Sequence, residues 1–242
     1  MRLPHAIDLD DAALRESVAR KTESATTLLR RIATDYRPAA LANSLSVEDM
    51  LLTDLIHRER LDIENFSLDT GRLPTETYDL IAAAETRYGR KFTWYYPRHD
   101  LVEPYVRTHG INAFRESVEL RRACCHARKV EPLQRALAGK RAWITGMRAQ
   151  QSATRAHLPE QVFDEANGLE KFNPLADWTE REVWAYIRLN DVPYNALHDR
   201  FYPSIGCAPC TRAITVGEDI RAGRWWWERP ETKECGLHAK QP

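Results

Sequence analysis

The chain has 242 residues, and its 35 lysines and arginines balance its 35 aspartates and glutamates. Such a balance gives no overall field that would hold the protein on nucleic acid or on a membrane surface. No stretch approaches the ~20 consecutive apolar residues of a membrane span, and the first residues lack the apolar core of a signal peptide. We therefore expect a cytoplasmic protein with neither a nucleic-acid nor a membrane partner.

Predicted helices alternate with short apolar strands through most of the chain. In chain order we predict a helix over 11–34, a strand over 39–43, a helix through Met50 and Ile56, a strand over 63–68, a helix ending near Tyr88, a strand over 92–95, helices across 100–138, a strand over 142–145 and a helix over 178–187 with Thr179 as its cap. This alternation favours an α/β fold with a doubly wound, mostly parallel sheet, whose ligands bind beyond the carboxyl ends of the strands.

After about residue 195 the periodicity is lost, and Pro, Gly and Trp become frequent. This composition indicates a loop-rich C-terminal segment. The simplest organisation is a single domain over 1–242, with an α/β core over about 40–225 and a mobile tail over about 226–242.

The five cysteines form an adjacent pair, a C-x-x-C motif and a single residue: Cys124 and Cys125, Cys207 and Cys210, and Cys235. Disulfides are rare in the cytoplasm, where paired cysteines are more often metal ligands or redox thiols. Thiolates three residues apart can reach one metal ion through a tight turn. The adjacent pair strains a tetrahedral zinc site and suits a larger object such as a 4Fe-4S cluster. Zinc, and four buried cysteines without a metal, remain the alternatives.

Cys235 lies in a short tail, two residues after Lys233 and three residues before His238. Nearby cations favour the thiolate, which is the nucleophilic form of cysteine. The tail contains no second cysteine that could resolve a covalent adduct. An external dithiol, or the four-thiolate site, would have to remove any group that Cys235 accepts. The alternative is an incidental cysteine in a surface tail.

Two predicted strand-to-helix turns share the rim where ligands of such sheets bind. Ser44–Asp49 presents hydroxyls and backbone N–H groups at a helix N-terminus, which favours anions, although an ordinary helix cap would look the same. Asp69–Arg72 is a turn in which Gly71 can take a positive φ. Basic residues of later segments could converge as a cradle for sulfate or phosphate oxygens, or could simply be exposed. They are Lys129, Arg148, Arg155, Arg221 and Arg224.

Seven segments, taken together and in this order, resemble the assimilatory sulfonucleotide reductases. They are Ser44–Asp49, Leu68–Thr77, Cys124–Leu133, Thr145–Ser152, Lys171–Leu175, Tyr202–Thr211 and Glu234–His238. Because this chain has both cysteine pairs, it resembles the branch of adenylyl-sulfate (APS) reductases. The branch without these pairs reduces the 3′-phosphorylated substrate, PAPS. The resemblance spans about residues 40–238 and implies an adenine nucleotide α-hydrolase-like fold, in agreement with the predicted sheet.

The resemblance implies a thiol-dependent, two-electron reduction of APS to sulfite and AMP, in assimilatory sulfate reduction and cysteine biosynthesis. Cys235 would attack the sulfur of APS and become S-sulfocysteine, and thioredoxin or a glutaredoxin-like dithiol protein would release sulfite. The ligands of a 4Fe-4S cluster would be Cys124, Cys125, Cys207 and Cys210. The implied substrate-binding residues are Ser44, Ser46, Glu48, Asp69, Thr70, Gly71, Arg72, Lys129, Arg148, Arg155, Arg221, Arg224 and His238. The sequence leaves open whether the protein is a homo-oligomer.

Three other functions are compatible with parts of the sequence. Reduction of PAPS on the same scaffold would need further cations for the 3′-phosphate, for which the sequence offers no candidates. An ATP-dependent enzyme of the same fold, such as a cluster-bearing tRNA thiolase, would need a glycine-rich pyrophosphate loop, which Ser44–Asp49 is not, and a basic surface for RNA. A zinc-stabilised binding module would have an inert Cys235.

Overall fold

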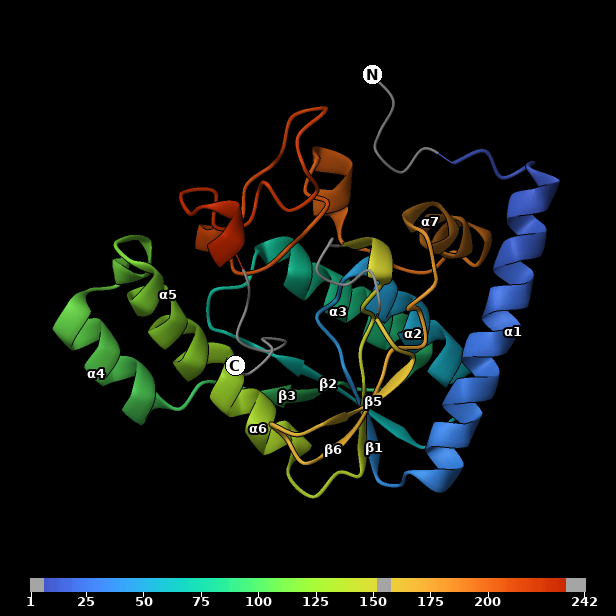
Figure 1. Cartoon of the computed structure of the whole chain (residues 1–242), viewed down its shortest axis with the longest axis horizontal. Coiled ribbons are helices and arrows are strands. Elements are labelled where there is room, and N and C mark those ends of the chain that lie inside the picture. Colours follow the sequence, from blue (N-terminus) through green and yellow to red (C-terminus); the bar gives the residue numbers. More distant parts are fainter. Residues whose placement is uncertain (1–6, 152–157, 234–242) are drawn as a thin grey trace.

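In the computed structural model, which describes residues 7–151 and 158–233, a six-stranded sheet forms the centre of the molecule (Figure 1). The strand order is β3-β2-β1-β4-β6-β5. The strands are β1 (Ala39–Ala42), β2 (Ile63–Leu68), β3 (Thr93–Tyr95), β4 (Ala142–Ile144), β5 (Gln161–Asp164) and β6 (Leu169–Phe172). All neighbouring pairs among the described strands are parallel except β5 with β6. The predicted mostly parallel sheet is therefore confirmed.

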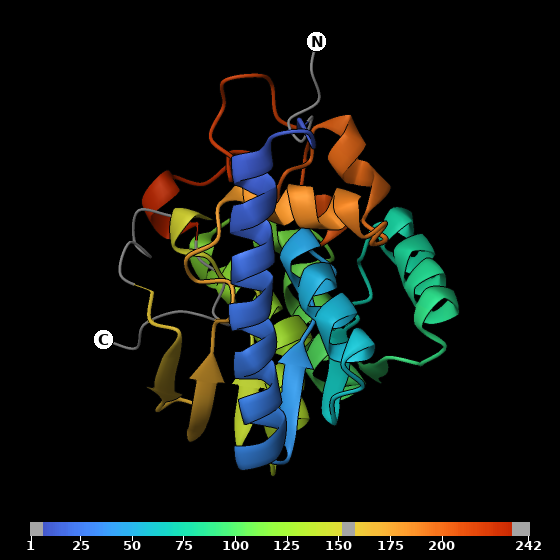
Figure 2. The ribbon, with the colours of Figure 1, turned by 90° about the vertical axis from the view of Figure 1, so that its right-hand side faces the viewer.

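Helices cover both faces of this sheet, which makes three layers (Figures 1 and 2). The α-helices are α1 (Ala12–Asp35), α2 (Val47–Arg58), α3 (Thr75–Tyr88), α4 (His99–His109), α5 (Val118–Cys125), α6 (Glu131–Leu137) and α7 (Glu180–Leu189), with a π-helical turn at His126–Val130 and short 3-10 helices at Ala113–Arg115, Ala149–Gln151, Ala196–Arg200, Ala208–Cys210 and Pro230–Thr232. One core packs α1, α2, α3 and α7 around Leu29 and Ile144, and a second packs α6 against Phe66 and Trp143. The predicted double winding is confirmed by these two cores.

The predicted helix boundaries agree with side chains that cap free backbone N–H groups. At the start of α1, the Asp11 carboxylate accepts a hydrogen bond from the Leu14 N–H. At the start of α7, Thr179 and Glu182 form a reciprocal capping box, which confirms Thr179 as the predicted cap. None of the helices in the described part of the chain combines the length and the apolar composition that crossing a membrane requires.

No strand is predicted over residues 161–172, where the structure has the β5–β6 hairpin. Two adjacent apolar residues of β5, Val162 and Phe163, are both exposed, at 40% and 54%. An edge strand of this kind lacks the alternation of buried and exposed side chains by which strands are recognised in a sequence. The hairpin turns at Gly168, which has a φ of 69°.

The carboxyl ends of the parallel strands meet at one edge of the sheet, below the segment that follows residue 195 (Figure 2). The turns after β1, β2 and β4 leave this edge next to one another. Backbone hydrogen bonds fix the three exits, from Asn43 N–H to Phe66 O at 2.8 Å, from Asp69 N–H to Tyr95 O at 3.0 Å and from Thr145 N–H to Phe172 O at 3.0 Å. The fold thus brings three loops together at the edge where doubly wound sheets bind ligands.

Candidate active site

A cavity of about 290 Å³ opens at this edge of the sheet. Its walls come from the turns after β1, β2 and β4, from the start of α7 and from parts of the segment 198–225. Residues of both Ser44–Asp49 and Asp69–Arg72 line it, so the prediction that these two turns share one rim is confirmed. A cavity in this place suits a nucleotide.

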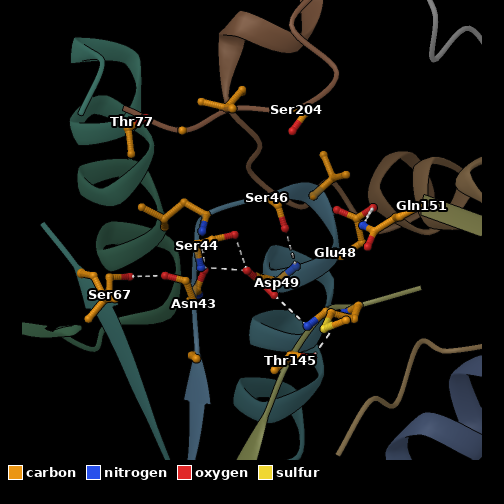
Figure 3. A pocket seen from close by; sticks show the side chains of 18 of the residues that line it. Asn43, Ser44, Ser46, Glu48, Asp49, Ser67, Thr77, Thr145, Gln151 and Ser204 are labelled. Carbon is orange, nitrogen blue, oxygen red and sulfur yellow. Dashed lines mark hydrogen bonds between the residues drawn. The ribbon is translucent and has the colours of Figure 1, made fainter. Parts of the chain in front are cut away.

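Asp49 links the turn after β1 to the turn after β4 by hydrogen bonds. Its Oδ2 accepts hydrogen bonds from the Ser44 N–H at 2.7 Å and from Ser44 Oγ at 2.6 Å, and its Oδ1 accepts one from the Gly146 N–H at 3.0 Å (Figure 3). A side chain at Gly146 would not fit, because a Cβ there would lie 2.5 Å from Asp49 Oδ1. Leu45 adopts a φ of 63°, and its N–H donates to Asn43 Oδ1 at 2.7 Å. Strain of this kind persists where surrounding contacts hold the chain, as in a preformed binding loop.

Burial raises the pKa of Asp49 to about 6 from its ordinary value of 3.8, although the hydrogen bonds from Ser44 and Gly146 act in the opposite direction. A carboxyl whose pKa is raised on folding stabilises the folded state below about pH 4, and this contribution is lost as the pH rises through about 6. We predict that the wild type loses up to about 3 kcal/mol of unfolding free energy relative to Asp49→Asn over this range. Urea denaturation of both proteins across the range measures the difference. A difference that does not change with pH would contradict the prediction.

Ser46 and Glu48 lie in the same turn, and both line the cavity. Ser46 caps α2 by accepting a hydrogen bond from the Asp49 N–H at 3.3 Å. Glu48 accepts hydrogen bonds from Arg148 Nε at 2.9 Å and from Gln151 Nε2 at 3.1 Å. Arg148, which the sequence suggests as a ligand of the phosphosulfate, therefore lines the cavity as the partner of a buried carboxylate.

The second turn is shaped by Asp69, which accepts hydrogen bonds from the Gly71 N–H at 2.7 Å and from the Tyr78 hydroxyl at 2.9 Å. Gly71 has a φ of 69°, as predicted for this turn. Among the four described residues of the turn, Thr70 is the one that lines the large cavity. Asp69 and Gly71 thus act on the cavity through the shape of the turn.

Arg72 points to a different part of the molecule. Its guanidinium donates to Ile111 O at 2.8 Å and to Asn112 Oδ1 at 3.0 Å, and it lies 4.9 Å from the centre of the Phe114 ring. These partners belong to the connection between α4 and α5. The structure therefore separates Arg72 from the other expected nucleotide ligands.

The two cysteine pairs meet in a second, smaller pocket of about 20 Å³. Cys124 and Cys125 end α5, while Cys207 and Cys210 lie at the single turn of helix over Ala208–Cys210. All four are free thiols, and all four line this pocket. Within 7–151 and 158–233, no set of three His, Cys, Asp or Glu side chains is arranged to hold a single metal ion.

Polar and cationic groups surround the four thiols. Thr70 Oγ1 lies 3.2 Å from Cys207 Sγ. Trp225 lines the pocket, and its buried Nε1–H has no hydrogen-bond partner in the described part of the chain. Burial raises the pKa of Cys210 to about 11, so thiolates need compensation by positive charge here. The cations that line the pocket are Arg72, Arg121, Arg128, Lys129 and Arg224.

The cavity and the cysteine pocket are neighbours, because Lys129, Arg224 and Trp225 line both of them. Arg224 Nη1 donates to Ile205 O at 3.1 Å. Its guanidinium packs against Gly206, where a Cβ would lie 2.4 Å from Nη2. The backbone next to Cys207 thus fixes a cation between the two pockets.

Arg221 also lines the large cavity, and its Nη2 donates to Lys233 O at 2.8 Å. Lys233 is the last residue before the undescribed C-terminal stretch. Cys235, His238 and Arg155, which the sequence analysis assigns to the site, lie outside the described residues.

Sequence reasoning assigns a role to only one of the three acidic residues that line the cavity, Glu48. Asp49 belongs to the quoted loop but is not assigned a role, and Glu180 at the start of α7 is not singled out at all. The position of Asp49, three residues after the cap Ser46, is the one signal that could have identified it, because a carboxylate in a first turn commonly bonds to the loop before the helix. Glu180 enters the site through tertiary packing, for which the sequence has no local signal.

The fold and the site together define a nucleotide-binding α/β protein in which the ligand cavity adjoins a pocket of four cysteines. The family model of the phosphoadenosine phosphosulfate reductase domain matches residues 38–213. The adenosine 5′-phosphosulfate reductase of Allochromatium vinosum is 58% identical to this chain, over 93% of this chain and 88% of its own length. That of Burkholderia cepacia is 56% identical, over 93% of this chain and 90% of its own length. The crystal structure of phosphoadenylyl-sulfate (PAPS) reductase from Candida auris, a phosphate complex, matches with a TM-score of 0.68 and 28% identity, over 82% of this chain and 97% of that one. The chain therefore belongs to the APS/PAPS reductase family, in its branch of adenosine 5′-phosphosulfate reductases, which are oxidoreductases that act on sulfur.

The expected adenine nucleotide α-hydrolase-like fold is confirmed by this structural match. A zinc-stabilised binding module without chemistry and an ATP-dependent thiolase are both set aside by the family to which the chain belongs.

Proposed function

We propose that this protein reduces APS to sulfite and AMP in assimilatory sulfate reduction, and that the sulfite supplies cysteine biosynthesis. The observation that carries the proposal is the shared wall of the two pockets, formed by Lys129, Arg224 and Trp225. APS has a nucleoside at one end and a densely charged phosphosulfate at the other. A nucleotide cavity with cations at the side of the thiols suits both ends, and the relatives named APS reductases favour this nucleotide.

We also propose that Cys124, Cys125, Cys207 and Cys210 ligate a 4Fe-4S cluster. Two observations support a bound group of this kind. The four thiols share one pocket, and the five cations that line it would compensate the charge of thiolate ligands. The unsatisfied Trp225 Nε1–H is a donor for which a sulfur would be an acceptor. When bound, the cluster would supply a fixed charge next to Lys129.

We assign the chemical step to the thiol of Cys235. Arg221, which lines the cavity, donates to the carbonyl of Lys233, and Lys233 precedes Cys235 by two residues in the sequence. The Cys235 thiolate attacks the sulfur of APS, so that an S–S bond forms while the S–O bond to the phosphate breaks. AMP leaves with the bonding electron pair, and Cys235 becomes S-sulfocysteine. Lys129 and Arg224 stabilise the charge that develops on the departing phosphate.

A dithiol protein of the thioredoxin or glutaredoxin type completes the reaction. Its first thiolate attacks Sγ of Cys235 and forms a mixed disulfide, while sulfite leaves. Its second thiol then closes the disulfide of the partner and restores the Cys235 thiol. The dithiol supplies both electrons. An external reductant is needed because residues 226–242 contain no cysteine besides Cys235, and the other four cysteines are assigned to the proposed cluster.

Intact-mass spectrometry tests the proposed function directly. The anaerobically purified holoprotein is incubated with APS in the absence of any thiol. We expect one added SO₃ group per chain, located on Cys235 by peptide mapping, together with one released AMP. Adding a dithiol should remove the group and release one sulfite. A protein that contains its cluster and binds AMP, but forms no adduct from APS, would contradict the proposal.

A further inference from the structure

Arg121 is a cation buried at the cysteine pocket. Its side chain is 0% exposed, and it lies one turn before Cys125 in α5, so both side chains are on the same face of this helix. Both residues line the cysteine pocket. Burial lowers the pKa of the Arg121 guanidinium, whereas Glu228 and then Cys125 raise it, and the net result is a pKa above the ordinary value. A carboxylate and a cysteine therefore act on one guanidinium.

The carboxylate comes from a distant part of the chain. Glu228 follows the tryptophan run Trp225–Trp227, and its side chain is only 4% exposed. Its two oxygens accept hydrogen bonds from Arg121 Nε at 2.7 Å and from Arg121 Nη2 at 2.9 Å, which is the two-pronged pairing that a guanidinium favours. A buried pair of this kind is costly to open from one side, because the remaining charge is left buried.

The same guanidinium also holds residues on either side of Glu228. Arg121 Nη2 donates to Thr232 O at 2.7 Å, and the centre of the guanidinium lies 4.7 Å from the centre of the Trp225 ring. Thr232 Oγ1 in turn donates to Glu228 Oε2 at 3.0 Å. The residues Trp225–Thr232, which we call the 225–232 segment, are thus gathered around one side chain of α5 (Figure 1).

Two other arginines of the cysteine pocket bond to different parts of the chain. Arg72 donates to Ile111 O at 2.8 Å, and Arg128 Nη1 donates to Thr70 O at 2.7 Å. Compensating the charge of thiolates needs a cation but no two-pronged bond to a carboxylate. The bond to Glu228 instead joins α5 to a residue 107 positions further along the chain. This difference indicates a second role besides charge compensation.

We infer that Arg121 is a positioning residue through which the cysteine pocket and the 225–232 segment stabilise each other, an inference that rests on the proposed cluster. The guanidinium is held on one side by the negative charge of a group on the four thiols, and on the other side by Glu228 and the Thr232 carbonyl. Such coupling is reciprocal, so losing the contacts of the segment also loosens the bound group.

Hydrogen exchange of the peptide over residues 226–233, measured by mass spectrometry on the anaerobic holoprotein, tests the effect on the segment. In Arg121→Lys the positive charge remains but the two-pronged bond is lost, so iron content should stay at the wild-type value while exchange becomes at least about tenfold faster. Removing the cluster from the wild type should also speed this exchange. The matched control is Arg122→Lys, the same substitution at the exposed neighbour on α5, which should exchange like the wild type.

Cluster loss tests the coupling in the other direction. Glu228 lines neither the cavity nor the cysteine pocket, so an effect of Glu228→Gln on the bound group passes through its partner Arg121. With an iron chelator present, we expect the visible absorbance of this variant to decay at least about threefold faster than that of the wild type. Because the segment leads to Cys235 in the sequence, SO₃ adduct formation from APS should also slow in both variants, with AMP affinity unchanged.

Wild-type exchange in Arg121→Lys would overturn the inference, because a cation alone would then suffice. Equal exchange in the cluster-containing and the cluster-free wild type would overturn it as well. If Arg121→Lys does not fold, as judged by iron content and thermal unfolding, Glu228→Gln decides the question, and decay at the wild-type rate is then the contrary result. A holoprotein that shows the coupling but forms no SO₃ adduct from APS would contradict the proposed reaction and leave the role of Arg121 standing.

Discussion

Replacing Cys235 by serine is expected to lower sulfite release from APS by at least roughly 1000-fold, while iron content and visible absorbance stay at wild-type values. Serine has nearly the same size, but its hydroxyl is a far weaker nucleophile than a thiolate. Lys129, Arg221 and Arg224 remain in place, so AMP should bind as it does to the wild type. Sulfite assays with a dithiol reductant, together with AMP calorimetry, measure both quantities.

The decisive experiment measures SO₃ adduct formation and AMP affinity of Cys235→Ser on the same protein preparation. Loss of the SO₃ adduct with retained AMP binding assigns Cys235 as the nucleophile. Full activity in Cys235→Ser would refute that assignment outright. Loss of AMP binding together with activity would mean that the tail residue acts in nucleotide binding instead.

Replacing Cys210 by serine should remove iron, activity and stability together. The thiol is one of four in the cysteine pocket, and that pocket shares Lys129 and Arg224 with the cavity. The proposed cluster would stabilise the folded state through its binding free energy, so losing one of its four ligands should lower both the iron content and the stability. We expect less than about a tenth of the wild-type iron and a clearly lower unfolding temperature.

Cys235→Ser is the matched control for this experiment, since it also exchanges one sulfur for oxygen, at a cysteine that belongs to neither of the two pairs. Iron analysis, absorbance and thermal unfolding of the two variants are compared under anaerobic conditions. A Cys210→Ser protein with full iron content and full activity would show that these thiols do not hold the proposed cluster.

Much of the fold can be predicted from the sequence, because its elements obey local rules. The helix that starts at Asp11 and the helix capped by Thr179 have both apolar periodicity and a capping side chain, and both form where they are predicted. The β5 strand could not be predicted in the same way, since its exposed Val162 and Phe163 follow no alternation.

The sequence predicts which segments form the site better than it predicts which side chains bond to one another there. The motifs correctly bring the loop Ser44–Asp49 to the cavity. They do not reveal that Arg148 pairs with Glu48, or that Arg72 turns toward Asn112. Both contacts join residues that are far apart in the sequence, and residue spacing in a motif contains no information about such tertiary contacts.

The hydrogen bond from Arg221 to the Lys233 carbonyl has a kinetic consequence. Two residues of extended chain span at most about 7 Å, so the Cα of Cys235 stays within that distance of the Cα of Lys233. In the proposed reaction, a nucleophile tethered this closely to a residue that is bonded to the cavity wall would meet its substrate intramolecularly. The anchor would then favour the protein's own thiol over small thiols dissolved in the surrounding water.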